Sequence, residues 1–204
     1  EGDVDASVPL ALIEQSLSEI VDYWGIDVDA VARNMGDSER RLCSVKLYSD
    51  WEAMGRELGC FDCAGTVTAC AFTGPTSRSL PTSEPCAGSP FAVAAGGYPA
   101  GDWLAVGAHE ITHVLQSYTW HLALDRTWVE DDLFREGVAE WTRYALGSGD
   151  FAADAQSVVS FWLRAGGTLD AVPFYLEYDV GASLVERCVR LGGSQRLWAI
   201  CSET

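Results

Sequence analysis

Residues 108–114 read Ala-His-Glu-Ile-Thr-His-Val, within a segment whose apolar residues recur at helical spacing. Residues four positions apart on a helix lie one turn apart on the same face, so His109 and His113 can reach the same metal ion. The carboxylate of Glu110 can then lie beside a metal-bound water, as in zinc hydrolases. The stretch therefore predicts a helix that carries two ligands of a zinc ion (Zn²⁺) and a general base.

A catalytic zinc ion also needs a third protein ligand and one open position for water. Residues 135–141, Arg-Glu-Gly-Val-Ala-Glu-Trp, offer two carboxylates one helical turn apart, Glu136 and Glu140. We assign Glu136 as the third ligand and Glu140 as the hydrogen-bond partner that fixes the tautomer of a ligand histidine. The reverse assignment is the alternative. A metzincin site is excluded, because Gln116 and Thr119 stand where that class requires glycine and histidine.

The 204 residues, 48% of them hydrophobic and with a formal net charge of −17, predict one compact domain or two small lobes that share a cleft. So acidic a chain, without clusters of lysine or arginine, is not expected to bind nucleic acid. The sequence contains no uncharged apolar run of 18 residues, so no membrane span is predicted. The first residues lack a basic start and an apolar stretch, and we expect that a signal peptide has already been removed.

Cysteine usage predicts disulfide bonds and hence a secreted, extracellular protein. The seven cysteines are Cys43, Cys60, Cys63, Cys70, Cys86, Cys188 and Cys201. We expect Cys188 and Cys201 to join the last two helices, and the odd cysteine to be free or to pair outside the chain. The alternative is a second zinc site that begins at the Cys-x-x-Cys of residues 60–63 and includes Cys70 and Cys86.

Apolar periodicity divides the chain into a mixed N-terminal part and a helical C-terminal part. Alternation predicts strands at 42–48 and 66–72 and a short edge strand at 91–94, and residues 73–102 form a long irregular segment rich in proline and glycine. Helices are predicted at 8–24, 51–58, from 102 onward, 131–146, 153–165, 180–191 and 194–202.

These motifs resemble those of the gluzincin metallopeptidases, specifically peptidase MA-like domains related to the catalytic domain of the zinc aminopeptidases. The resemblance covers about residues 42–200, with specific motifs only between 109 and 182. It rests on residues 109–113, on Trp128 followed by residues 136–141, on Tyr-Asp-Val-Gly-Ala at 178–182, and on residues 45–50, which are similar to the first strand and helix cap of the family.

The resemblance implies that His109, His113 and Glu136 bind zinc and that Glu110 is the general base. It also implies that Tyr178 steadies the oxyanion formed during hydrolysis of a peptide or protein substrate, with Tyr175 as the alternative. The expected fold is α+β, a single zincin-type domain over residues 1–204. A small mixed sheet with helices would occupy about residues 1–102, a mostly helical part about residues 103–204, and a thermolysin-like zincin cleft would lie between them.

Zinc aminopeptidases carry an upstream Gly-x-Met-Glu-Asn-type segment whose glutamate holds the free amine of the substrate, and this sequence has no such segment. We therefore expect an endopeptidase, with residues 91–95 as the edge strand that holds the substrate backbone by β-augmentation. Two alternatives keep the metal. One is a zinc-dependent amidohydrolase acting on a non-peptide substrate, and the other is a non-catalytic or latent zinc-binding interaction domain.

Overall fold

The computed structural model of the protein describes residues 7–29, 45–48, 69–71, 91–94, 103–120, 132–147 and 149–202. Three short strands are described by their backbones alone. Among the residues whose side chains the structure describes, 86% are helical and none lies in a strand. The expectation of an α+β fold with a small mixed sheet is therefore wrong for this part of the chain. Its buried core consists of side chains from helices packed on helices, because the apolar stripes of those helices cover one another.

The helices follow the predicted ranges closely. The predictions at 8–24, 131–146 and 194–202 are confirmed to within a residue, whereas the last long helix begins three residues before its predicted start at 180. The helix predicted at 51–58 lies outside the described residues. The helical elements are α1 (Ser7–Trp24), α4 (Trp103–Thr119), α5 (Asp132–Leu146), the π-helical turn η6 (Ala152–Gln156), α6 (Ser157–Arg164), the 3-10 turns η7 (Leu169–Ala171) and η8 (Phe174–Leu176), α7 (Glu177–Gly192) and α8 (Ser194–Ser202).

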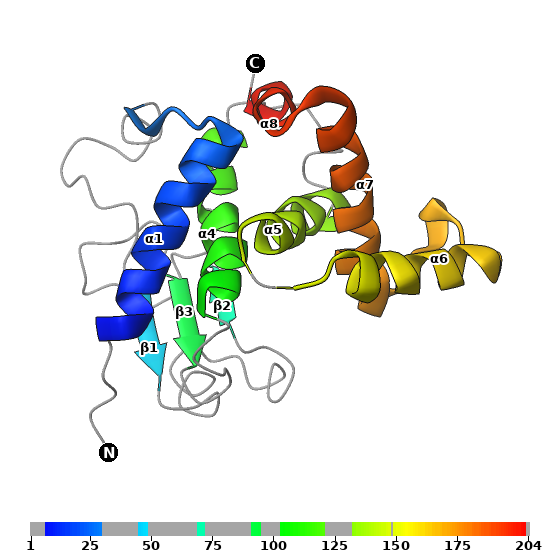
Figure 1. Ribbon diagram of the computed structural model, residues 1–204, viewed down its shortest axis with the longest axis horizontal. Helices are drawn as coiled ribbons and strands as arrows, with labels where there is room; N and C mark the ends of the chain where they lie inside the picture. The colour runs from blue at the N-terminus through cyan, green and yellow to red at the C-terminus, as the bar shows by residue number, and fades with distance from the viewer. Residues whose placement is uncertain are drawn as a thin grey trace.

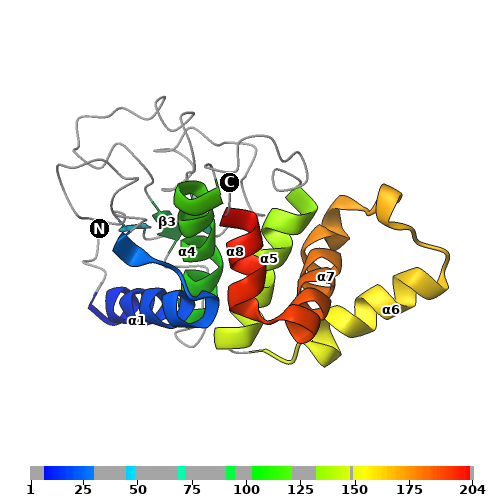
Figure 2. The ribbon, with the colours of Figure 1, turned by 90° about the horizontal axis from the view of Figure 1, so that it is seen from above.

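The helices α1, α4, α5 and α7 follow one another across the molecule, and α6 lies at the far end (Figure 1). Seen from above, α8 lies between α1 and α7 and packs against both (Figure 2). None of the described helices combines the length and the apolar character that a membrane span requires.

Helix α1 is tied to the rest of the bundle by polar contacts at its C-terminal end. The indole Nε1 of the buried Trp24 donates to Oγ1 of Thr142 on α5 at 2.9 Å, and Nε1 of Trp141 donates to the hydroxyl of Tyr23 at the same distance. The hydroxyl of Ser194, the first residue of α8, donates to the backbone carbonyl of Tyr23 at 2.6 Å. Each such bond contributes about 1 kcal/mol. Together they tie α1 to α5 and to α8.

Three short strands pair through their backbones. The strand β1 (Val45–Tyr48) is parallel to β3 (Phe91–Ala94), with Val45 opposite Phe91, and β2 (Ala69–Ala71) is antiparallel to β3, with Cys70 opposite Ala92. The order is therefore β1-β3-β2. The prediction that residues 91–95 form an edge strand is wrong. Because β3 is hydrogen-bonded on both sides, it cannot accept a substrate strand by β-augmentation.

The predicted disulfide between the last two helices is also wrong. Cys188 is exposed on α7, whereas Cys201 is buried on α8, and the two are not bonded to each other. A disulfide requires the two Cβ atoms to approach within about 4.5 Å, and side chains that point to solvent and to the core do not meet. The side chains of the other five cysteines lie outside the described part of the chain, so the expectation of secretion stays a prediction.

Two glycines allow α5 and α7 to cross in backbone contact. A Cβ atom added to Gly137 on α5 would lie 2.6 Å from Cα of Gly181 on α7, and one added to Gly181 would lie 2.7 Å from Cα of Gly137. Real Cβ atoms do not approach a backbone that closely, so no other residue fits at either position without moving a helix. The crossing lies one residue after Glu136 and three residues after Tyr178, which brings these two candidate site residues to neighbouring places.

We expect the variant Gly181→Ala to lower the free energy of unfolding by about 1–3 kcal/mol, as overpacking in other cores does. The matched control is Gly192→Ala at the end of the same helix, where an added Cβ would meet only Cδ of Arg196, at 3.9 Å. The control should be unchanged or more stable by up to about 1 kcal/mol, since alanine is the better helix former. Denaturant unfolding of both variants measures the difference, and equal stabilities would contradict the close crossing.

Candidate metal centre

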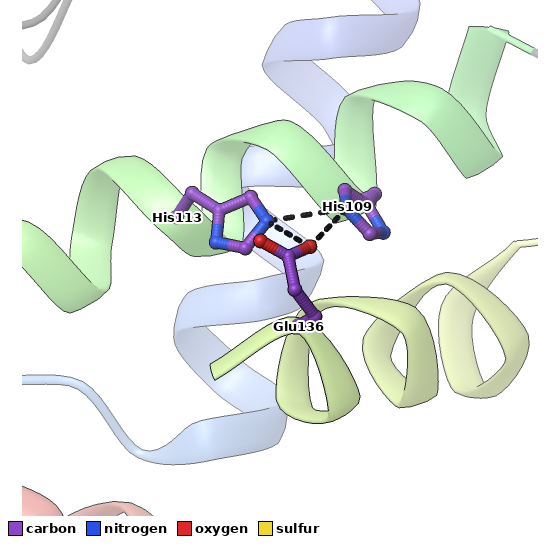
Figure 3. Close-up of side chains that lie close together, drawn as sticks. All are labelled: His109, His113 and Glu136. Carbon is purple, nitrogen blue, oxygen red and sulfur yellow. Dashed lines mark hydrogen bonds and ion pairs between the residues drawn. The ribbon is translucent and has the colours of Figure 1, made fainter. Parts of the chain in front are cut away.

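Three side chains from two helices converge on one point. His109 and His113 lie one turn apart on α4, and Glu136 reaches them from near the N-terminal end of α5 (Figure 3). The Nε2 atoms of the two imidazoles are 3.1 Å apart. Oε2 of Glu136 lies 3.1 Å from Nε2 of His113 and 3.4 Å from Nε2 of His109. Each of the three residues therefore offers one ligand atom to the same small volume.

These separations match what a tetrahedral zinc ion requires. Nitrogen and oxygen ligands lie about 2.0–2.2 Å from zinc, and two such ligands at a tetrahedral angle are therefore ~3.3 Å apart. The three measured separations, from 3.1 to 3.4 Å, lie on both sides of that value. The donor set of two imidazoles and one carboxylate is also that of catalytic zinc sites, which leave the fourth position to water. The three residues present thus fit zinc in spacing and in chemistry.

The outer nitrogen of each imidazole is held by a hydrogen-bond acceptor. Nδ1 of His109 lies 3.2 Å from Oε2 of Glu140, and Nδ1 of His113 lies 2.9 Å from Oε1 of Gln116. A carboxylate or amide oxygen can only accept, so Nδ1 carries the hydrogen in both rings. Each neutral ring then presents an unprotonated Nε2 to the centre. This is the tautomer that binds a metal through Nε2.

The electrostatics of the centre favour a positive charge between the imidazoles. Burial by itself lowers the pKa of His109, but hydrogen bonds with Glu136 and Glu140 and the negative charge of Glu110 raise that pKa to about 10. Burial raises the pKa of Glu136, and the hydrogen bonds with His109 and His113 outweigh it and hold the pKa far below its usual range. Two facing nitrogen lone pairs and a carboxylate repel one another unless a cation lies among them. That cation is either a proton or a metal ion.

Glu140 lies behind His109 rather than at the point of convergence. Its Oε2 accepts from Nδ1 of His109, and its Oε1 accepts from Nε of Arg143 at 2.9 Å and from Nη2 of the same guanidinium. Burial raises the pKa of this carboxyl, and the contacts with His109 and Arg143 lower it more strongly. Glu136, the glutamate assigned from the sequence, is the one whose oxygen approaches both Nε2 atoms.

The general-base candidate Glu110 is buried, with an exposed fraction of 8%. Its negative charge contributes to the raised pKa of both His109 and Tyr178. A carboxylate that follows a ligand histidine in the chain and is largely shielded from solvent has the position expected of a base beside a reacting water.

The structure separates the two tyrosines that the sequence left open. The ring of Tyr178, on the first turn of α7, stacks on the ring of His109 with centroids 5.7 Å apart, and 40% of the residue is exposed. Burial and the negative charges of Glu136 and Glu110 raise its pKa to about 12, so the phenol keeps its proton at neutral pH and can donate it in a hydrogen bond. Tyr175 lies on η8 with an exposed fraction of 76%.

Sequence reasoning missed two residues that support the centre, Gln116 and Arg143. Each lies three residues after the residue that it contacts, His113 and Glu140 respectively. On a helix, residues three apart are neighbours on the same face, so this spacing was the available signal. It was weak, because glutamine and arginine are also common on solvated helix faces.

Comparisons of this chain with protein-family models, with curated proteins and with solved structures find no match. Its function is therefore argued from the geometry of the centre.

Proposed function

We propose that the protein is a zinc-dependent metallopeptidase that hydrolyses peptide bonds. The observation that carries this proposal is the convergence of His109, His113 and Glu136, with the buried carboxylate of Glu110 and the phenol of Tyr178 beside them. Zinc held by the three ligands would supply a Lewis acid that polarises the substrate carbonyl and lowers the pKa of a water to about 7.

The remaining groups of the centre have separate tasks in the hydrolysis. Glu110 takes a proton from the attacking water and returns it to the nitrogen of the leaving amine, so it begins and ends the cycle as a carboxylate. Tyr178 donates a hydrogen bond from its protonated phenol to the oxyanion that develops on the substrate carbonyl. Glu140, braced by Arg143, keeps the ring of His109 in one orientation.

Within this class, we propose an endopeptidase that acts on peptides or proteins outside the cell. The sequence lacks the glutamate-bearing segment with which zinc aminopeptidases hold a free amine, and its cysteine usage is that of secreted proteins. Because β3 is paired on both sides, we expect an element other than β3 to hold the substrate backbone.

Zinc and protein hydrolysis should appear together. The purified protein should contain about one equivalent of zinc, digest casein and cleave peptides that are blocked at both ends, and lose both activities with a chelator until zinc is restored. The blocked peptides distinguish an endopeptidase from an aminopeptidase. Bound zinc without cleavage of either substrate would contradict the peptidase proposal and leave the metal centre standing.

The variants Glu110→Gln and Glu136→Ala should differ in what they lose. Glu110→Gln removes the base and none of the three proposed ligands, so turnover should fall to background while zinc remains bound. Glu136→Ala removes a ligand, so zinc affinity should fall as well as turnover. Metal analysis after dialysis and a casein assay measure both quantities. Activity that survives in Glu110→Gln would exclude this residue as the general base.

Replacing each tyrosine by phenylalanine should show which phenol takes part in catalysis. Tyr178→Phe keeps the ring that stacks on His109 and removes only the donor, so kcat should fall about 100-fold with zinc affinity unchanged. Tyr175→Phe is the matched control, three residues away and largely exposed, and its kcat should equal that of the wild type. A larger loss in the control than in Tyr178→Phe would reverse the assignment.

A further inference from the structure

Gln116 connects the candidate metal centre to the backbone of the neighbouring helix. It lies on α4, three residues after His113, with an exposed fraction of only 2%. Its Oε1 lies 2.9 Å from Nδ1 of His113, and its Nε2 donates to the backbone carbonyl of Arg135 at 3.0 Å. Arg135 is the residue immediately before Glu136 on α5. One buried side chain therefore touches a proposed ligand and the backbone next to another.

The chemistry of these contacts leaves each group one role. A backbone carbonyl can only accept a hydrogen bond, so the amide nitrogen of Gln116, and not its oxygen, must face Arg135. The amide oxygen is then turned to His113 and also can only accept. Nδ1 of His113 therefore carries a hydrogen, and in the neutral ring the lone pair lies on Nε2, toward Glu136 and His109.

We propose that Gln116 is a positioning residue of the metal centre. It selects the metal-binding tautomer and ring orientation of His113 and, through Arg135, holds the first turn of α5 at the spacing that Glu136 needs. This inference rests on the proposed function, because it assumes that the three ligands bind a metal.

His109 and His113 are held in different ways. Behind His109 stands a carboxylate that is itself paired with Arg143, and behind His113 stands a neutral amide. The carboxylate holds its imidazole through charge as well as through geometry, whereas the amide acts through geometry alone. Loss of the amide should therefore act on the orientation of the ring and the spacing of the ligands, without adding or removing a charge.

Zinc affinity of the whole protein, measured by competition with a chelator, tests the role of Gln116. Gln116→Met keeps the length of the side chain and removes both hydrogen bonds, and zinc affinity should fall about 10–100-fold. The matched control is Thr119→Val, which removes another buried polar group of α4. That hydroxyl donates to the carbonyl of Leu115 in its own helix, at 2.8 Å, and zinc affinity should stay within about threefold of the wild type.

Gln116→Glu provides a rescue that a purely structural role would not show. It keeps an oxygen acceptor for Nδ1 of His113 and loses only the donor to Arg135, so it should bind zinc about tenfold more tightly than Gln116→Met, which loses both. The visible spectrum of the cobalt(II) form reports ligand geometry. It should keep the shape of the wild type in Thr119→Val, and it should change less in Gln116→Glu than in Gln116→Met. Circular dichroism of the metal-free proteins establishes that each variant is folded.

The outcomes separate this inference from the proposal on which it rests. A wild type that binds no zinc overturns both. A wild type that binds zinc, with Gln116→Met bound as tightly as Thr119→Val, overturns the positioning role alone. If Gln116→Met does not fold, Gln116→Ala decides, because it removes the same two hydrogen bonds. Zinc affinity at least about tenfold below that of Thr119→Val supports the role, and equal affinity overturns it.

Discussion

The contact between α5 and α7 at Gly137 and Gly181 is the constraint on which the candidate site depends. Two helices can approach to backbone contact only where neither has a side chain, and both glycines meet that condition. Each costs about 1 kcal/mol of helix propensity, which the close packing of the two helices must offset. The crossing places Glu136 and Tyr178 beside the imidazoles of α4. The positions of the proposed ligand and of the phenol therefore depend on the same contact between α5 and α7.

Most of the centre could be predicted because its residues are spaced one helical turn apart in the sequence. His109 and His113 share a face of one helix whatever the rest of the chain does, and Glu136 and Glu140 are one turn apart on the next. The choice between the two glutamates depends on how α5 lies on α4, which spacing alone does not give. The structure shows the difference: Oε2 of Glu136 approaches the inner nitrogens, and Oε2 of Glu140 the outer one.

The predictions that proved wrong concern contacts between distant segments. Residues 91–94 have the alternation of a strand, but alternation does not tell whether a strand is central or at an edge, and β3 is central among the three described strands. Cys188 and Cys201 lie on successive helices, yet one faces solvent and the other the core. The alternating stretches do contain short strands, but the α+β expectation was wrong because the described part of the chain is dominated by amphipathic helices that bury one another's apolar faces.

Helix α1 joins the two ends of the described chain. The ring of Trp24 lies 5.4 Å from that of Trp198 on α8, and its Nε1 bonds Thr142 at the back of the helix that carries Glu136. The two helices that carry the proposed ligands, α4 and α5, therefore depend on α1 for their packing. A fragment that begins at α4 would expose the indole of Trp198 and leave Thr142 without the donor on Trp24. Transfer of this centre to another scaffold would therefore require α1 as well.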